Sequence, residues 1–246
     1  MTGFGTAARY GYPDVGLITQ TEMAQNLKHV CRATDLPVVA DADTGYGGPV
    51  NVRETVRGYE IAGVSAIQIE DQDFPKKCGH LSGHKLIPAE DMVTKIKVAL
   101  DSRFSDDTLI IARTDARETD GLDCAIDRIN RYCAAGADIA FIEAPLLLGE
   151  LEDICRRVPY PKFVNMLAFG KTPILSAGEL EEMGFKMMVA PIDSVLLTAR
   201  AMRDLAETFK RDGHTRALYD QMVDFGGIKD ILGLNDYLSL RERLQR

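Results

Sequence analysis

Short apolar runs alternate with longer amphipathic segments along this 246-residue chain, and this pattern constrains its fold more than any other feature. Six of the runs have the length and apolar content of strands that are buried on both faces of a parallel sheet. These predicted strands span residues 36–40, 66–70, 109–113, 139–143, 162–165 and 186–190. Each interval between them can hold a helix and two loops, and helices are predicted at 52–62, 90–100, 124–134 and 194–210. The chain is therefore expected to form the repeated strand–helix units of an α/β fold.

Helix boundary signals agree with this division. Thr19 is followed three residues later by Glu22, and Ser176 is followed in the same way by Glu179. Each pair matches a capping box that precedes an amphipathic run. Gly63 comes directly after a predicted helix, where a helix-stop glycine is expected.

Polar side chains stand at the carboxyl end of nearly every predicted strand. In an open doubly wound sheet such residues gather at one switch point, whereas in a barrel all strands direct these ends toward one mouth. The distribution therefore favours a barrel, although N-caps of the following helices would also place polar residues here. The residues are Asp41, Asp43, Glu70, Arg113, Asp115, Glu143 and Asn165.

Charge and composition narrow the class of partner and the compartment. The net charge is −8 and no basic stripe is present, so the sequence argues against nucleic acid as a partner. No apolar run is long enough for a membrane span, and no signal peptide is evident. The five cysteines are scattered, which fits a reducing cytosol better than a disulfide framework. We expect a cytoplasmic protein, or a mitochondrial one if a transit segment belongs to it.

An oxygen-rich pocket is predicted where two of the strands end. Asp41 and Asp43 lie in the segment 41–48, which also contains three glycines, and Glu70 and Asp71 end the next strand. So many carboxylates repel one another, and a hard cation such as Mg²⁺ resolves the repulsion while it keeps several waters. The alternative is a solvated acidic loop without a metal.

The segment Lys76-Lys77-Cys78-Gly79-His80 is the second chemical signal. A thiol that is flanked by two lysines and a histidine is expected to have a depressed pKa. Such a cysteine can act as a nucleophile or as a proton donor and acceptor. The alternative is a surface loop in which the cysteine has no chemical role.

Arg113 is the third signal, because it follows a buried apolar run and should lie near the mouth of the barrel. A guanidinium at this place suits bidentate binding of a carboxylate. The alternative is a structural ion pair with Asp115 or Glu143.

Taken together, these segments resemble the isocitrate lyase / phosphoenolpyruvate mutase superfamily over nearly the whole chain. The resemblance rests on the ordered motifs at residues 12–14, 41–48, 69–72, 76–80, 112–115, 141–144 and 165–173. It implies one (β/α)8 TIM-type barrel domain over residues 1–246, with a helical segment from about residue 211 that is exchanged between subunits in a dimer of dimers. It also implies Mg²⁺, or alternatively Mn²⁺, held directly or through waters by Asp41, Asp43 and Glu70, with Asp14 nearby.

The same resemblance assigns roles around a small di- or tricarboxylate substrate. Arg113, Asn165 and backbone amides near Thr2, Gly3 and Gly79 would bind its carboxylates. A base that the sequence does not identify removes the hydroxyl proton, and a retro-aldol-type cleavage then gives an α-keto acid and a carboxylate-stabilised carbanion. Cys78 would protonate the carbanion, Lys76 and His80 would tune the thiol, and Glu143 would orient His80.

Within the superfamily, the resemblance favours a carbon–carbon lyase of the 2-methylisocitrate or dimethylmalate type. Phosphonate mutases carry Asn at the position of Cys78, and fungal oxaloacetate hydrolases tend to have Ser at the position of Pro191. An oxaloacetate hydrolase or decarboxylase is the enzymatic alternative.

Two departures from the family pattern matter. The chain starts near the end of the family's second strand, so we expect a barrel that lacks the first strand–helix–strand, and a truncated, non-catalytic oligomer partner is another alternative. His84 stands where the family usually has Lys, from which we expect a shifted substrate preference.

Overall fold

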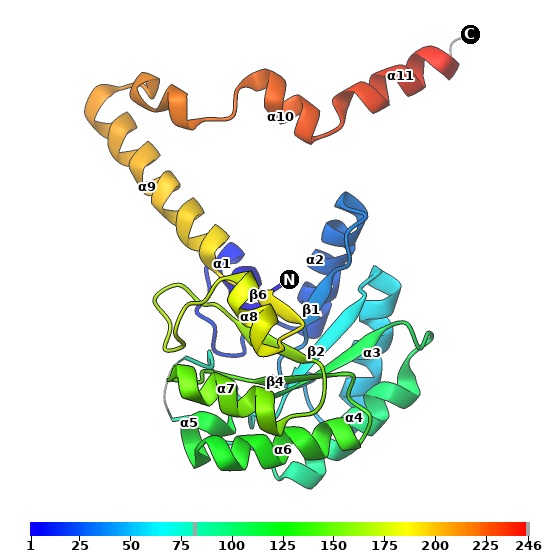
Figure 1. The fold of residues 1–246 in the computed structure, drawn as a ribbon. Helices are drawn as coiled ribbons and strands as arrows, with labels where there is room; N and C mark the ends of the chain where they lie inside the picture. Colours follow the sequence, from blue (N-terminus) through cyan, green and yellow to red (C-terminus); the bar gives the residue numbers. More distant parts are fainter. Residues whose placement is uncertain (81–82, 245–246) are drawn as a thin grey trace. The chain divides into compact units, whose positions relative to one another are not determined.

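The computed structural model describes residues 1–80 and 83–244 (Figure 1). The chain consists of two compact units, Met1–Val195 and Leu196–Arg246. The first unit contains the sheet and its helices in the order α1(Gly3–Arg9), α2(Gln20–Ala33), β1(Val39–Asp41), α3(Pro49–Ala62), β2(Ala66–Glu70), α4(Ala89–Ser102), β3(Leu109–Thr114), α5(Ala116–Asp120), α6(Leu122–Ala134), β4(Ile139–Ile142), α7(Leu148–Arg157), β5(Lys162–Asn165), α8(Ala177–Met183) and β6(Met187–Val189).

The sheet has six parallel strands in the order β1-β2-β3-β4-β5-β6. Each strand pairs with the next one along the chain, for example through Glu70 opposite Arg113 and Phe163 opposite Met187. The six predicted strands and the α/β class are confirmed, and within the described ranges the sheet corresponds to part of a barrel with two free edges. At one edge the Met1 ammonium donates to the Val39 carbonyl at 2.6 Å, and the Asp41 amide donates to the Met1 carbonyl at 3.0 Å.

Strand alternation separates two faces of the sheet. Ile67, Ile69, Ile110 and Ala112 belong to a large core that packs against the helices, because every second side chain of a strand points the same way. The intervening side chains form a smaller inner cluster of Ala66, Ile111, Ile139, Phe141 and Phe163. Functional side chains that occupy the same alternate strand positions as this inner cluster therefore point into the concave side of the sheet, which we call the inward parity.

Helix ends follow the local sequence signals. The Thr19 side chain accepts from the Glu22 amide while Glu22 accepts from the Thr19 amide, and Ser176 and Glu179 form the same box. Both predicted capping boxes are thus confirmed. Gly63 ends α3 with a φ of 98°, a left-handed conformation that glycine adopts without strain.

One predicted strand boundary was too early. The run at 36–40 becomes a strand only at Val39, and Leu36 is 75% exposed. Pro37 explains the shift, since proline has no amide hydrogen to donate to a ladder.

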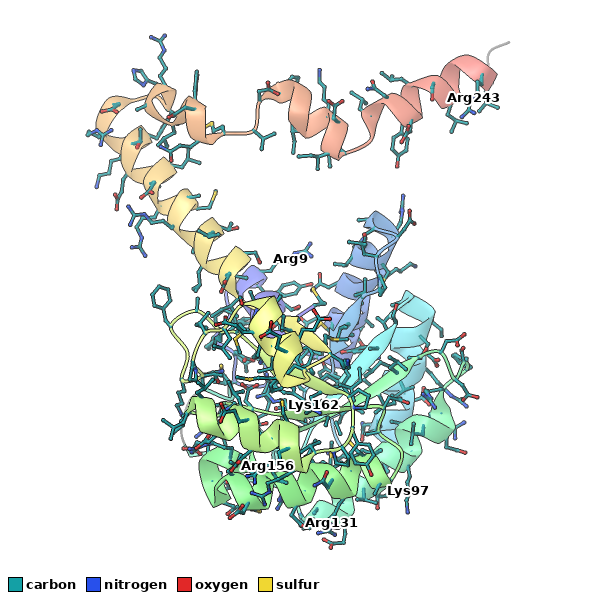
Figure 2. All side chains as sticks on the ribbon, viewed as in Figure 1. Arg9, Lys97, Arg131, Arg156, Lys162 and Arg243 are labelled. Carbon is teal, nitrogen blue, oxygen red and sulfur yellow. The ribbon has the colours of Figure 1, made fainter. Side chains whose placement is uncertain are left out.

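The helices around the sheet are also joined by polar contacts on their outer surface. Arg131 of α6 lies 2.5 Å from Glu90 of α4, and Figure 2 shows Arg131 on the solvent side of the helix layer. An exposed pair of this kind contributes little to stability, so the buried apolar face of each helix is what fixes its position.

The second unit consists of helical segments. It contains the larger part of α9(Asp193–Asp212), followed by η1(Arg216–Gln221), α10(Phe225–Ile231) and α11(Leu234–Leu244). Large apolar side chains of this unit are exposed, among them Phe225, Ile231, Leu232 and Tyr237. Throughout the part of the chain that the structure describes, no helix has both the length and the apolar character needed to cross a bilayer.

Candidate active site

The concave face of the sheet carries polar side chains at the carboxyl ends of five neighbouring strands. Asp41, Glu70, Arg113, Glu143 and Asn165 all have the inward parity, at or directly after the ends of β1 to β5. A cavity of about 490 Å³ opens beside them, and its walls include Thr2, Asp41, Gln68, Arg113, Asn165 and Pro191. The structure therefore brings together residues that the sequence placed at separate strand ends.

A carboxylate that follows β1 and the carboxylate of Asp14 both contact one ammonium group. Lys76 Nζ lies 2.6 Å from Asp14 Oδ1 and 2.7 Å from Asp43 Oδ1. Asp41 accepts from the Gly3 amide at 2.9 Å and from the Asp43 amide at 3.0 Å. The Gly3 amide, which was expected to bind substrate, thus donates to Asp41.

The charges of this cluster are incompletely compensated. Burial and the neighbouring Asp41 raise the pKa of Asp43 from 3.8 to about 7. Burial likewise raises the pKa of Glu70 well above its usual value, and Glu70 Oε1 is buried without a hydrogen-bond partner among the described residues. A further cation in the pocket would relieve both effects.

The side chains of this cluster are candidate ligands of a divalent ion. Within residues 1–80 and 83–244, no three carboxylate, imidazole or thiol side chains are close enough to hold a metal by themselves. Magnesium commonly retains several waters and uses only one or two carboxylates directly. Asp43 and Glu70 are buried, Asp14 and Asp41 are partly buried, and all four supply only oxygen donors. This donor set fits Mg²⁺ that is bound in part through water.

Glu143 is the centre of a second cluster. Its Oε2 lies 3.1 Å from Arg113 Nη1 and accepts from Asn165 Nδ2 at 3.0 Å. His80 Nδ1 accepts from the Lys171 amide at 3.0 Å, so the ring proton of neutral His80 belongs on Nε2, which lies 3.0 Å from Glu143 Oε1. Although burial alone would raise it, the pKa of Glu143 is lowered by Arg113 and His80. The predicted pairing of Glu143 with His80 is present.

Arg113 is held by carboxylates on three sides. Its Nε and Nη2 donate to the two Asp115 oxygens at 3.0 and 2.8 Å. Nη1 faces Glu143, and Nε lies 3.4 Å from Glu70 Oε2. The structural ion pair that we considered as an alternative is therefore formed, and it holds a guanidinium with further N–H groups at the wall of the cavity.

Cys78 reaches this region on the segment after β2. Gly79 is seated so tightly that a Cβ added there would lie 2.7 Å from Asp115 Oδ1 and 2.5 Å from Glu143 Cγ. The loop thus contacts the ends of β3 and β4, and only glycine allows this approach.

The prediction of a depressed thiol pKa was wrong, because burial raises the pKa of Cys78 above 9.0. The assignment of Lys76 as a group that tunes the thiol was also wrong in its geometry. Its ammonium is committed to Asp14 and Asp43, and the lysine that precedes Cys78, Lys77, is exposed and directs Nζ to the Gly83 carbonyl at 3.2 Å.

Comparison with known proteins decides the family. The protein-family model described as phosphoenolpyruvate phosphomutase matches residues 1–210 of this chain. The chain belongs to this phosphoenolpyruvate phosphomutase family. The 2,3-dimethylmalate lyase of Eubacterium barkeri is 46% identical over 235 residues, which cover 95% of this chain and 81% of the relative. The 2-methylisocitrate lyase of Bacillus subtilis is 39% identical over 246 residues, covering 100% of this chain and 81% of the relative.

Solved structures agree with this membership of the phosphomutase family. A crystal structure of 2,3-dimethylmalate lyase, a PEP mutase/isocitrate lyase superfamily member, matches with a TM-score of 0.94 and 35% identity. The match covers 99% of this chain and 82% of that chain. Phosphonopyruvate hydrolase in complex with oxalate and Mg²⁺ matches with a TM-score of 0.88 and 26% identity, covering 100% of this chain and 86% of that chain. The superfamily resemblance inferred from the motifs is confirmed.

In this phosphomutase-family chain, Asp71 lies outside the oxygen-rich pocket in which it was predicted. Asp71 follows the last inward residue of β2 and points to the opposite face, where it accepts from Thr114 Oγ1 and Tyr132 Oη, both at 2.7 Å. It also accepts from the Asp115 amide at 3.0 Å and lies 3.2 Å from Arg128 Nη1. Asp71 therefore fixes the turn that carries Asp115 and takes no part in the oxygen-rich pocket, as strict strand alternation would have indicated.

Proposed function

We propose that this chain is a magnesium-dependent carbon–carbon lyase that cleaves an alkyl-substituted 2-hydroxy di- or tricarboxylate to an α-keto acid and a second carboxylate. One observation carries the proposal: the Cys78 loop is seated by Gly79 against Arg113 and Glu143, beside the buried carboxylates. The relatives named dimethylmalate lyase and methylisocitrate lyase support the substrate class.

The residues around the cavity support separate parts of the reaction. Arg113 and Asn165 present donors for a substrate carboxylate, and their geometry is fixed by Glu143. Burial keeps the Cys78 thiol protonated at neutral pH, so it can donate a proton to a carbanion left by C–C cleavage. A thiol with a depressed pKa would have suited nucleophilic attack instead.

Asp41, Asp43, Glu70 and Asp14 would hold Mg²⁺, or alternatively Mn²⁺, directly or through waters. When bound, the ion supplies Lewis acidity toward the oxygens of the substrate. The phosphonopyruvate hydrolase complex with oxalate and Mg²⁺ supports this choice of ion for the family.

A homo-oligomer, and specifically a dimer of dimers with an exchanged C-terminal helical segment, also belongs to the proposal. It is supported by the large apolar side chains that the second unit leaves exposed. Sedimentation equilibrium of the purified chain tests the assembly independently of the activity.

The decisive experiment incubates the protein with Mg²⁺ and, one at a time, 2,3-dimethylmalate, 2-methylisocitrate, isocitrate and oxaloacetate. Release of an α-keto acid is followed by coupling to lactate dehydrogenase, and EDTA should abolish it. We expect turnover of an alkyl-substituted malate or isocitrate and its loss in Cys78→Ser. Release of oxalate from oxaloacetate, with none of the other three substrates cleaved, would show that the alternative hydrolase is correct.

A further inference from the structure

The backbone on both sides of Cys78 is held by side chains of its own loop. The Gln72 side chain binds both backbone polar groups of Lys77. Its Nε2 donates to the Lys77 carbonyl and its Oε1 accepts from the Lys77 amide, both at 2.9 Å. The two legs of the loop pair at the base, where the Asp73 amide donates to the Lys85 carbonyl at 2.7 Å. Lys77, the residue before Cys78, is therefore held by the segment that directly follows β2.

Cys78 itself is held by His84, which lies in the part of the loop that leads back to α4. His84 Nε2 lies 3.1 Å from the Cys78 carbonyl, and His84 Nδ1 lies 3.4 Å from Glu118 Oε2 on α5. The His84 side chain is completely buried, whereas 24% of the Glu118 side chain is exposed. A carbonyl only accepts, so the ring proton on Nε2 donates to Cys78. Nδ1 faces the Glu118 carboxylate at ion-pair distance without forming a hydrogen bond among the described residues.

We propose that His84 is a positioning residue that anchors the Cys78 peptide to α5 through Glu118 and so sets where the thiol stands. This inference rests on the proposed function, because it concerns the group that would donate the proton. His84 acts through the backbone of Cys78 and through Glu118, and it is not required to touch substrate. The planar ring is in contact with both neighbours at once, because Nε2 faces the Cys78 carbonyl and Nδ1 faces the Glu118 carboxylate.

The two ring nitrogens can be tested separately. Gln can place its amide nitrogen near the position of a histidine Nε2, and Asn near that of Nδ1. His84→Gln therefore retains the hydrogen bond to Cys78, and His84→Asn retains only a polar group that faces Glu118. Iodoacetamide alkylation of Cys78, followed by peptide mass spectrometry, reports how well the thiol is held. This readout distinguishes Cys78 from the four other cysteines and does not need the lyase reaction.

We expect Cys78 to be alkylated roughly tenfold faster in His84→Asn than in the parent, which corresponds to loss of one buried hydrogen bond. His84→Gln should remain within about twofold of the parent because the Cys78 contact survives. The kcat for lyase turnover should fall in the same order, with a smaller change in KM. His29→Asn and His29→Gln, at an exposed histidine of α2, are the matched controls.

Equal alkylation rates in the parent, His84→Asn and His84→Gln would overturn the inference. If His84→Asn does not fold, Glu118→Ala replaces it, and an alkylation rate equal to that of the parent again overturns the proposal. Failure of the lyase assay with an intact order of alkylation rates would refute the proposed function and leave the anchor in place. If the parent cleaves substrate but neither His84 variant changes the alkylation rate of Cys78, the anchor alone is refuted.

Discussion

Lys76 Nζ lies 2.7 Å from Asp43 Oδ1, so a lysine of the thiol loop is the counter-ion of the oxygen-rich pocket. Both side chains are buried, with 5% and 7% of their surfaces exposed. Burial alone would lower the pKa of Lys76, but Asp43, Glu70 and the neighbouring aspartates raise it well above its usual value. The loop after β2 is therefore tied electrostatically to the end of β1.

Replacing Lys76 by Met should destabilise the metal-free protein. Removal of one partner from a buried ion pair costs about 3–5 kcal/mol, since the other charge remains buried without compensation. Added Mg²⁺ should restore part of the loss, because a ligand that binds only the folded state stabilises it. Urea unfolding with and without Mg²⁺ measures both quantities.

Lys28→Met, at an exposed lysine of α2, is the control for this substitution and should change the free energy of unfolding little. If the Lys76→Met protein were as stable as the parent without Mg²⁺, the ammonium would not be the counter-ion of the pocket.

The strands and the residues at their ends could be predicted because strand parity acts locally. Glu70 and Arg113 point inward as the last inward residues of buried runs, and the sequence suffices to identify them. The environment of Cys78 could not be predicted, because neighbours in sequence diverge in an irregular loop. Lys76 turns to Asp43, Lys77 turns to solvent, and the thiol is left half-buried with a raised pKa.

Asp43 should make the metal-free protein less stable as the pH rises. Its pKa is 3.8 in an ordinary environment and about 7 in the fold, so between these values the folded state binds more protons than the unfolded state. Stability present at low pH is then lost with a slope of up to roughly 1.4 kcal/mol per pH unit from this group. The free energy of unfolding, measured from pH 4 to 8 in EDTA, is compared between the parent and Asp43→Asn.

Asn is a suitable replacement because the φ of residue 43 is 47°, a left-handed conformation that Asn tolerates better than most residues. The difference between parent and variant should shrink at saturating Mg²⁺, since the ion favours the ionised carboxylate. Parallel stability curves for the two proteins in EDTA would contradict the assignment of this titration to Asp43.

Cys78 should act as an acid and not as a thiolate. Because burial raises the pKa of the thiol, its alkylation rate should be low at pH 7 and still be rising above pH 9.0. Cys78→Ser should lower kcat by a factor on the order of 10²–10⁴ and change KM little, as expected for loss of a general acid. Cys155→Ser, on α7, serves as the control, and an alkylation rate that levels off below pH 8 would argue for a nucleophilic thiolate instead.

Pro191 should help to select an alkyl-substituted substrate. It lines the cavity together with Phe163 and Val189, so its ring gives this wall an apolar surface that suits methyl groups. Pro191→Ser places a hydroxyl there and should lower the ratio of kcat/KM for 2,3-dimethylmalate to that for oxaloacetate by roughly tenfold, the effect of about one misplaced group in an apolar pocket. Pro191→Ala removes the ring without adding a donor and should lower turnover of dimethylmalate alone. If both variants changed the ratio equally, the hydroxyl would have no specific effect, and selection would depend only on the volume that the ring fills.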